Sequence, residues 1–319
     1  MPINREEIKN ILVVRNDRFG EFLLNIPAFR AVKESFPQAL LIAVVDPRIK
    51  ELVKAIKCVD ETKEWASGRH PLKEKIALFK WLRAKSIDLA IMLNPSRDFN
   101  LLTFIAGIPI RAGYDRKLGF LLNYKIKDAK HLAEKHEVDY NLDLVGLVGA
   151  RTYDKSLSLA VGGNSNNPEI LGRAIVLHPW ASDPVKQWPE ESFRLLAEKI
   201  ISEIKVKVLI IGGQENMDKS QRLFCGFDNS LLDMTGRTTF GELALLLKES
   251  RLLVSGDSGP VHLGCAVGTP VIAIFSNVIL GKSAKRWGPW GKNTAVIEKN
   301  RLTDITVDDV FNKIKEMLA

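Results

Sequence analysis

Apolar residues gather in short runs that predict buried strands, and the segments between these runs have the mixed pattern of helices. Continuous apolar runs of this length are typical of strands that are covered on both faces of a parallel sheet. Strands alternating with helices at this spacing predict an α/β domain. In chain order, the expected elements of the first half lie at 11–14, 22–36, 40–45, 51–56, 72–85 and 89–93.

A second series of the same kind begins at Ala174, after the small and polar stretch 162–168, which we interpret as a linker. We predict two Rossmann-like domains, residues 1–165 and residues 166–319. Each is expected to be a doubly wound parallel sheet, and the two are expected to face a cleft. We leave open whether the last helix, 307–318, packs back on the first domain. The expected elements of the second half lie at 174–177, 190–201, 207–211, 240–248, 252–254, 260–267, 271–275 and 308–318.

Length and composition agree with this division, because 319 residues suit two domains of about 150 residues each. Hydrophobic residues make up 46% and charged residues 26%, as in ordinary globular proteins. The three cysteines, Cys58, Cys225 and Cys265, lie far apart and form neither a disulfide framework nor a zinc pattern. The start of the chain has no apolar signal core, and no apolar run reaches the roughly 18 residues of a membrane span. We therefore expect a cytoplasmic protein.

The positive charge is uneven along the chain. Residues 1–160 hold 27 Lys and Arg against 20 Asp and Glu, a net charge of +7 out of the total of +8. A basic first half favours an anionic partner, such as a phosphorylated substrate, an acidic membrane or a nucleic acid. A basic surface that serves only solubility is the alternative.

The most informative stretch is 252–275, which predicts a strand, a Gly-rich turn, a helix and another strand. We expect Ser258 to cap the helix with its hydroxyl and Pro260 to occupy a first helical position. The N–H groups and the positive dipole end of this helix then lie at the carboxyl end of a strand, where phosphates bind. Asp257 and His262 flank the same opening.

Reactive side chains collect at other expected strand ends. Asp17 and Glu21 follow the first strand, while Lys186 and Glu215 follow strands of the second half. A loop lysine suits a diphosphate, and a carboxylate in the opposite domain suits a general base. Taken singly, each has a structural explanation as a surface lysine, a helix-start acid or a cap. The sequence lacks an Asp-x-Asp pair, so we predict no metal site.

Several segments together resemble the bacterial heptosyltransferases of glycosyltransferase family 9, which build the inner core of lipopolysaccharide. The resemblance extends over nearly the whole chain. It is carried by 11–39 with its G-E loop, by the K-x-W-P-x-E-x-F segment within 178–200, by GGQEN at 212–216, by 233–250 and by 255–275.

This resemblance implies a GT-B glycosyltransferase fold that needs no cofactor and no metal, and that inverts the anomeric centre. The implied donor substrate is a nucleotide-sugar, ADP-heptose, bound by the C-terminal domain, and the implied acceptor is a phosphorylated lipid-linked saccharide, bound by the N-terminal domain. Lys186 would neutralise the diphosphate. Glu215 would hold the ribose and Asp257 the donor sugar. The remaining donor-binding candidates are Ser182, Ser258, Gly259 and His262.

The family's proposed base is an aspartate after glycine, and here Glu21 occupies that position. Glutamate is one methylene longer, so Asp17 is a rival for the role of base. We predict Glu21, because Asp17 lies between Arg15 and Arg18 and is better placed for a structural ion pair. Arg15, Arg18 and Arg111 are the acceptor-binding candidates.

Two alternatives remain. One is the same fold acting on another nucleotide-sugar or acceptor, and the other is a non-catalytic nucleotide-sugar-binding or membrane-surface protein. The basic helix expected at 72–85 motivates a hypothesis of peripheral contact with the cytoplasmic face of the inner membrane. We expect a monomer that binds no nucleic acid.

Overall fold

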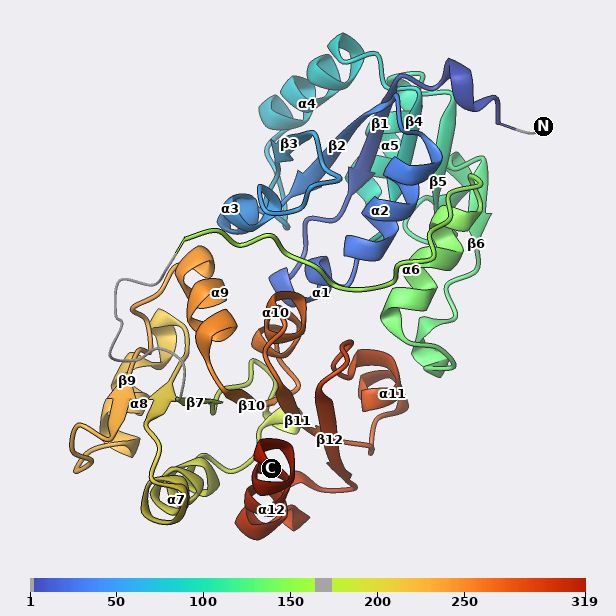
Figure 1. Cartoon of the computed structure of the whole chain (residues 1–319). Helices are drawn as coiled ribbons and strands as arrows, with labels where there is room; N and C mark the ends of the chain where they lie inside the picture. The colour runs from blue at the N-terminus through green and yellow to red at the C-terminus, as the bar shows by residue number, and fades with distance from the viewer. Residues whose placement is uncertain (1–2, 164–173) are drawn as a thin grey trace. The chain divides into compact units, whose positions relative to one another are not determined.

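The computed structural model describes residues 3–163 and 174–319, and these residues form two compact units. Residues up to 156 belong to the N-terminal unit, except for 132–134, and residues from 157 onward belong to the C-terminal unit. The domain boundary predicted between 165 and 166 lies outside the described residues. Each unit contains one parallel sheet (Figure 1).

The sheet of the N-terminal unit has six parallel strands in the order β3-β2-β1-β4-β5-β6. The order reverses between β1 and β4, as in doubly wound folds. The strands are β1 (Asn10–Val14), β2 (Leu40–Val45), β3 (Glu61–Glu64), β4 (Leu89–Met92), β5 (Ile110–Tyr114) and β6 (Tyr124–Ile126).

The sheet of the C-terminal unit repeats this arrangement with the order β12-β11-β10-β7-β8-β9, again all parallel. Its order reverses between β7 and β10. The strands are β7 (Ile175–His178), β8 (Val208–Ile210), β9 (Leu231–Asp233), β10 (Leu252–Gly256), β11 (Val271–Ser276) and β12 (Thr294–Lys299).

Helices connect the strands of both units. In the N-terminal unit they are α1 (Phe19–Leu23), α2 (Ile26–Ser35), α3 (Lys50–Val53), α4 (Leu72–Ala84), α5 (Arg97–Ile105) and α6 (Glu137–Gly146). In the C-terminal unit they are α7 (Glu190–Lys199), α8 (Met217–Leu223), α9 (Phe240–Glu249), α10 (Gly259–Val267), α11 (Ala284–Trp287) and α12 (Val307–Leu318). None of the helices in 3–163 and 174–319 is long and apolar enough to cross a bilayer.

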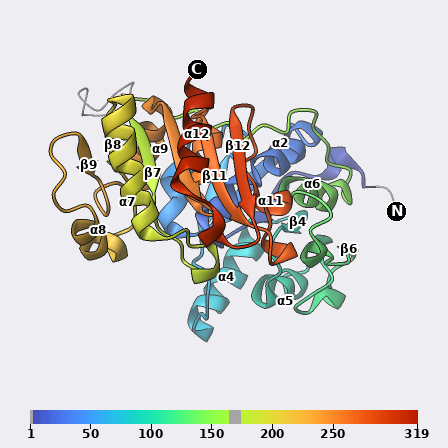
Figure 2. The ribbon, with the colours of Figure 1, turned by 90° about the horizontal axis from the view of Figure 1, so that it is seen from below.

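The apolar runs read from the sequence form the two cores. All four residues of Ile11–Val14 are fully buried, as expected for a central strand covered on both faces. Helix α12 packs on α7 and β12 within the C-terminal unit, where Figure 2 shows it across the sheet. Its side chains Val310, Phe311 and Ile314 share that unit's core with Trp188. The last helix therefore completes the C-terminal core.

The α/β class and the doubly wound sheets are confirmed, but one helix that was predicted as continuous is divided in two. The helix expected at 22–36 is two helices, because the chain turns at Leu24–Asn25 before Pro27 at the start of α2. Proline cannot donate to the preceding turn, so the first helix ends ahead of it. The chain also forms elements that the sequence did not predict, among them the polar edge strand β3 and helices α5 and α6.

Candidate functional site

The first candidate site lies at the carboxyl ends of β1 and β4, where the strand order of the N-terminal sheet reverses. Arg15 follows β1 directly, and its Nη1 donates to the carbonyl of Leu93, which follows β4, at 3.3 Å. Asn94 Nδ2 donates to Asn16 Oδ1 across the same point at 3.3 Å. Ligands of doubly wound sheets bind at such reversal points.

Three carboxylates surround the buried guanidinium of Arg15. Its Nε lies 2.7 Å from Asp17 Oδ1, its Nη2 3.0 Å from Glu21 Oε2 and its Nη1 3.7 Å from Glu137 Oε1. Burial alone would lower the pKa of Arg15, but these carboxylates raise it overall, so Arg15 stays charged. Its side chain is only 3% exposed. Arg15 therefore holds carboxylates together, and the predicted direct role in acceptor binding is not supported by this arrangement.

Glu21 lies in the first turn of α1 and is the carboxylate most suited to accept a proton. Its side chain is 29% exposed, so it can reach solvent or a substrate. Burial raises the pKa of Glu21 to about 7; the charge of Arg15 opposes this shift, and the carboxylates of Asp17 and Glu137 add to it. A carboxyl group that ionises near neutral pH is matched to general-base catalysis at that pH.

Gly20, the residue before Glu21, lies inside α1 and is absent from the described glycines with positive φ. Helix α1 itself directs the side chain of Glu21 toward Arg15. Asp17 does pair with Arg15 as predicted, but Glu21 pairs with the same guanidinium. The ion pair alone does not distinguish the two candidates.

Sequence reasoning missed two members of this cluster, Glu137 and Lys130. Glu137 begins α6 and is 1% exposed, and Lys130 Nζ lies 2.5 Å from its Oε1. Lys130 also lies 4.5 Å above the ring of Tyr114. Glu137 is an acid in the first turn of α6, a helix that was not predicted from the sequence. Because Glu137 and Lys130 are far from Arg15 in sequence, their contact with this cluster could not be predicted either.

The other two acceptor-binding candidates are placed differently from one another. Arg18 precedes α1 and is exposed, close in sequence to Asp17 and Glu21. Arg111 is the second residue of β5, so it lies near the amino end of that strand, opposite the sheet edge that holds Arg15. Its guanidinium donates to the carbonyls of Leu121 and Ile108. The structure therefore does not bring Arg111 to the candidate site.

The second candidate site lies at the carboxyl ends of β7 and β10, the reversal point of the C-terminal sheet. His178 ends β7, and its Nδ1 lies 3.1 Å from the hydroxyls of both Ser255 and Ser258. The two hydroxyls lie 2.7 Å apart. Burial lowers the pKa of His178 to about 4, so the ring is neutral at pH 7. This network ties the end of β7 to the start of α10.

The network corrects the expectation that the Ser258 hydroxyl caps α10. Among the described residues, Ser258 makes no side-chain cap hydrogen bond, because its hydroxyl is turned toward Ser255 and His178. Pro260 does occupy the first turn, as predicted. With its cap serine turned away, the positive end of the nine-residue helix α10 can interact with an anion.

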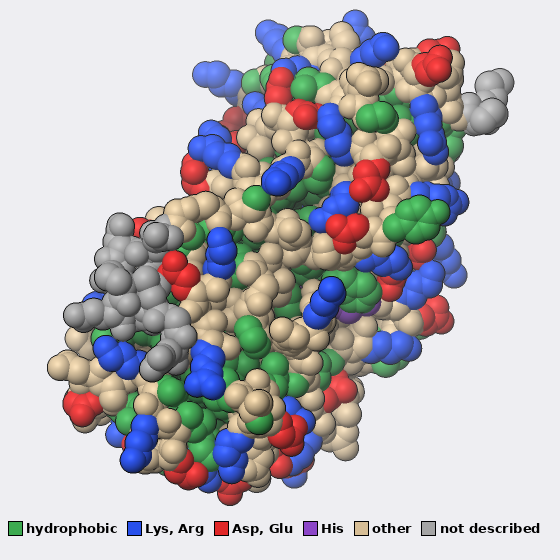
Figure 3. All heavy atoms as spheres, in the orientation of Figure 1, with side chains coloured by type: hydrophobic (Ala, Val, Ile, Leu, Met, Phe, Trp, Pro, Cys, Tyr) green, Lys and Arg blue, Asp and Glu red, His purple; other side chains and the backbone are tan. Residues whose placement is uncertain are grey.

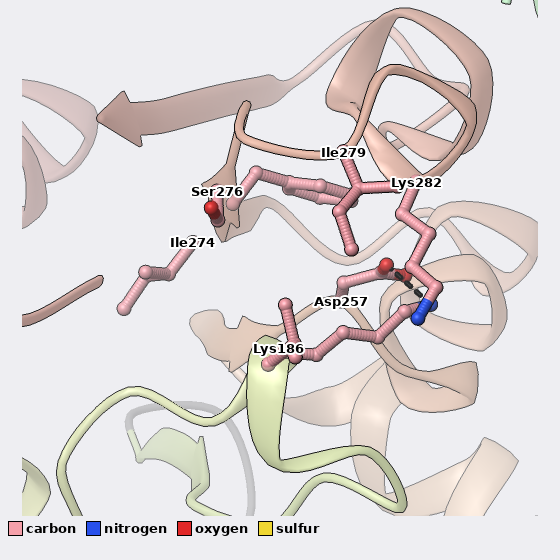
Figure 4. A pocket seen from close by; sticks show the side chains of 8 residues that line it. Lys186, Asp257, Ile274, Ser276, Ile279 and Lys282 are labelled. Atoms are coloured by element: carbon pink, nitrogen blue, oxygen red, sulfur yellow. Dashed lines mark ion pairs between the residues drawn. The ribbon is translucent and has the colours of Figure 1, made fainter. Parts of the chain in front are cut away.

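Lys186 and Asp257 meet across this reversal point. Lys186 ends the short 3-10 helix η5 (Pro184–Lys186) after β7, and Asp257 follows β10 directly. Lys186 Nζ lies 2.5 Å from Asp257 Oδ2, with the side chains 18% and 9% exposed. Figure 4 shows both side chains at a small pocket. The other lining residues are Val185, Ile274, Phe275, Ser276, Ile279 and Lys282.

Lys282 is a second cation of this pocket that sequence reasoning missed. Its Nζ lies 2.6 Å from Asp183 Oδ2, and it donates to that carboxylate. Asp183 in turn accepts from the backbone N–H of Val185 and so shapes the loop that carries Lys186. Two lysines and one aspartate therefore line the pocket, with Asp183 holding Lys282 from outside it, a composition that can bind a charged phosphate while keeping each lysine fixed.

The remaining donor-binding candidates lie in different surroundings. Glu215 and Ser182 are exposed, Glu215 on the 3-10 helix η7 (Gln214–Asn216) after β8 and Ser182 in the loop after β7. Gly259 is the first residue of α10. His262 is buried inside α10, 4% exposed, and does not line the pocket described above. Its placement favours a packing role over direct contact with a diphosphate.

Solved structures share this architecture. The structure of E. coli ADP-heptose lps heptosyltransferase II matches 97% of this chain and 98% of its own with a TM-score of 0.81 at 21% identity. An E. coli heptosyltransferase WaaC with ADP matches 97% and 99% with a TM-score of 0.80 at 22% identity. Two doubly wound parallel sheets in one chain, matched over their whole length, define a protein of the GT-B fold class.

Sequence comparisons identify the family. The family model for glycosyltransferase family 9 (heptosyltransferase) matches residues 75–313. Lipopolysaccharide heptosyltransferase 2 of Salmonella typhimurium is 23% identical over 290 residues, 83% of this chain and 82% of the relative. Lipopolysaccharide heptosyltransferase 1 of E. coli O18:K1:H7 is 25% identical over 336 residues, 96% of this chain and 97% of the relative. The chain belongs to glycosyltransferase family 9, the heptosyltransferase family, and is a glycosyltransferase.

Proposed function

We propose that this enzyme transfers a heptose from ADP-heptose to a phosphorylated acceptor of the lipopolysaccharide inner core, with inversion and without a metal ion. The observation that carries the proposal is the pairing of Lys186 with Asp257 beside the start of α10. That arrangement offers a fixed cation and a helix dipole to a diphosphate, and a carboxylate to sugar hydroxyls. The names of the relatives, lipopolysaccharide heptosyltransferases 1 and 2, and the ADP in a solved E. coli structure support the donor and the acceptor.

The C-terminal unit binds the donor in this proposal. The diphosphate lies at the amino end of α10, near Ser258 and Gly259, where Lys186 offsets its charge. Asp257 accepts hydrogen bonds from the heptose, and Glu215 accepts them from the ribose. Ser182 lies in the same loop as Lys186 and contributes a hydroxyl. The neutral ring of His178 keeps the Ser258 hydroxyl away from the helix end, so the backbone N–H groups face the diphosphate.

The N-terminal unit supplies the base. The Glu21 carboxylate takes the proton of an acceptor hydroxyl as the oxygen of that hydroxyl attacks the anomeric carbon of the heptose. The bond from the anomeric carbon to the diphosphate oxygen breaks, and ADP leaves with the electron pair. Because attack and departure occur on opposite faces in one displacement, the configuration inverts. Lys186 and α10 stabilise the charge that develops on the leaving diphosphate.

The acceptor carries phosphates, which fits the excess of basic residues in the first half of the chain. Arg18 is the exposed arginine nearest to Glu21 in sequence, and we assign it to acceptor binding, whereas Arg15 positions Glu21. Since the acceptor is lipid-linked, we place the enzyme at the cytoplasmic face of the inner membrane.

The test is a transfer assay with ADP-heptose and a heptose-free inner-core acceptor, read by product mass and by the anomeric configuration in NMR. The proposal expects one heptose added with inverted configuration in the presence of a chelator. A panel of nucleotide-sugars measured by thermal stabilisation identifies the donor independently, since a ligand at 100 times its dissociation constant adds about 2.7 kcal/mol. Transfer from another nucleotide-sugar, or binding of ADP-heptose without turnover over a range of acceptors, would contradict it.

A further inference from the structure

Helix α5 carries a stripe of large apolar side chains on its exposed side. Leu101, Phe104 and Ile105 follow one another at helical spacing and are 42%, 47% and 51% exposed. The opposite side of the same helix, with Phe99 and Leu102, is buried in the core of the unit. Burial of α5 on its own sheet therefore leaves this second apolar face uncovered.

Neighbouring segments extend the stripe. The 3-10 helix η3 (Gly119–Leu121) packs against α5, and its Phe120 is 72% exposed. Asn100 of α5 donates to the carbonyls of Arg116 and Lys117 at 3.2 and 3.1 Å, which fixes this segment beside the helix. Apolar side chains from two elements thus point to solvent in one region of the unit.

Helix α4 lies next to α5, as Figure 2 shows, and Lys75 of α4 pairs with Asp98 of α5 at 2.8 Å. Leu78 and Leu82 of α4 are buried against the sheet. The exposed apolar residues of α4 are instead Leu72 and Ile76, at 72% and 47%. The centre of an exposed apolar surface is therefore on α5, with the start of α4 at its border.

These elements are also rich in basic residues. Helices α4 and α5 and residues 116–120 contain seven Lys and Arg but only two Asp and Glu. Arg97 and Lys117 are exposed at the border of the stripe, and the guanidinium of Arg111 lies 5.4 Å from the ring of Phe104. Over the face drawn in Figure 3 as a whole, positive and negative side chains are interspersed.

Exposed aromatic and aliphatic side chains bordered by Lys and Arg have the chemistry of a surface that enters the headgroup region of an anionic bilayer. The apolar groups replace contact with water by contact with acyl chains, and the cations pair with lipid phosphates. We propose that the surface formed by α4, α5 and residues 116–120, here called the α4–α5 surface, binds anionic lipid membranes. This inference goes beyond the proposed transfer reaction and does not depend on the donor or the acceptor.

The experiment is flotation of the full-length protein with vesicles of phosphatidylcholine alone or of phosphatidylcholine with 30% phosphatidylglycerol, without any sugar substrate. We expect binding to the anionic vesicles that weakens as salt is added, and little binding to the neutral ones. The variant Arg97→Gln/Lys117→Gln should reduce the partition coefficient about 30-fold, because each basic residue near the membrane contributes a factor of about five and the two factors multiply. The variant Phe104→Ser/Ile105→Ser should reduce it by roughly tenfold or more.

The matched control is Leu195→Ser/Val296→Ser in the C-terminal unit, where the side chains are 46% and 41% exposed, and it should bind like the wild type. Circular dichroism and the thermal midpoint establish that each variant is folded. Equal and negligible binding to both vesicles, or unchanged binding by both α4–α5 variants, would overturn the proposal. So would a dimer of the wild type in sedimentation velocity that Phe104→Ser/Ile105→Ser converts to a monomer, since the surface would then join two copies. Transfer to a water-soluble acceptor fragment reports on the proposed function separately.

Discussion

The two units share one strand order but place different chemistry at the point where it reverses. In the N-terminal unit, Arg15 links the ends of β1 and β4 and is surrounded by Asp17, Glu21 and Glu137. In the C-terminal unit, a neutral His178 links the ends of β7 and β10, and Lys186 pairs with Asp257 at the surface of a pocket. The backbone architecture is the same, so the difference between the two proposed roles comes from the side chains at equivalent edges.

The difference lies in the balance of charge and burial. The first cluster contains three carboxylates and two cations, Arg15 and Lys130, so it has one more negative than positive charge. Burial in this cluster raises the pKa of Glu21 to about 7. In the second site the neutral histidine adds no charge, and a lysine and the positive end of α10 can interact with an anion. One reversal point is thus suited to removing a proton and the other to holding a diphosphate.

Glu21→Gln should have the largest effect on turnover, because it keeps the size of the side chain and removes the basic oxygen. We expect a loss of about 10²–10⁴-fold in kcat with ADP-heptose affinity close to that of the wild type. Single-turnover transfer and calorimetric titration of the donor measure the two quantities. If Asp17→Asn is the inactive variant and Glu21→Gln remains active, the base has been assigned to the wrong carboxylate.

Glu137→Gln should destabilise the N-terminal unit, because it leaves Arg15 and Lys130 without the full charge of their buried partner. We expect a loss of about 3 kcal/mol in the free energy of unfolding, at the lower end for breaking a buried ion pair. Urea denaturation measures it. Asp143→Asn is the control, since the Lys135–Asp143 pair is exposed and should contribute less than about 1 kcal/mol. Equal losses in both variants would show that the buried cluster is no more important than a surface pair.

Lys186→Ala tests the reversal point of the C-terminal sheet and should lower kcat. Loss of one electrostatic donor to the leaving diphosphate predicts a fall of about 10²–10³-fold in kcat at saturating donor. Lys282→Ala is the comparison within the same pocket, and its effect should be smaller because Lys282 lies on the 3-10 helix η8 (Leu280–Lys282) after β11 and not at the reversal point between β7 and β10. An unchanged kcat for Lys186→Ala would remove this lysine from the transition state.

Asp17→Asn should have the smallest effect and should change the pH dependence more than the maximal rate. The carboxylate of Asp17 helps to raise the pKa of Glu21, so its removal lowers that pKa. Glu21 must be ionised to accept a proton, and the acid limb of the rate profile should therefore move to lower pH. A shift to higher pH would mean that the two carboxylates do not interact as their shared contact with Arg15 indicates.

The fold was largely predictable from the sequence, since buried parallel strands are continuous apolar runs such as Ile11–Val14 and Val271–Phe275. Elements without that signal were missed. Strand β3 is polar because it lies at a sheet edge, and α5 is apolar on two sides, so neither has the pattern of a half-buried element. The division of one expected helix into α1 and α2 depended on how the chain turns before Pro27.

The candidate site was predictable where its residues are close in sequence to a strand end. Lys186 and Asp257 follow β7 and β10, and the parallel sheet brings them together. Glu137 and Lys130 could not be found in this way, because they approach Arg15 from a part of the chain more than a hundred residues away. The hydroxyl of Ser258 could either cap helix α10 or form a hydrogen bond with His178. The sequence favours the cap, and only the three-dimensional position of His178 shows that the hydroxyl bonds to the ring.

The pH dependence of kcat/KM for heptose transfer, from pH 5.5 to 9, tests the central claim most directly. The account predicts a rate that rises with pH through an inflection near 7, where Glu21 loses its proton. The same inflection should be absent from the residual activity of Glu21→Gln, which separates the enzyme's base from titration of the acceptor phosphates. A profile without an inflection in the wild type, or an identical inflection in the variant, would contradict the assignment of Glu21 as the base.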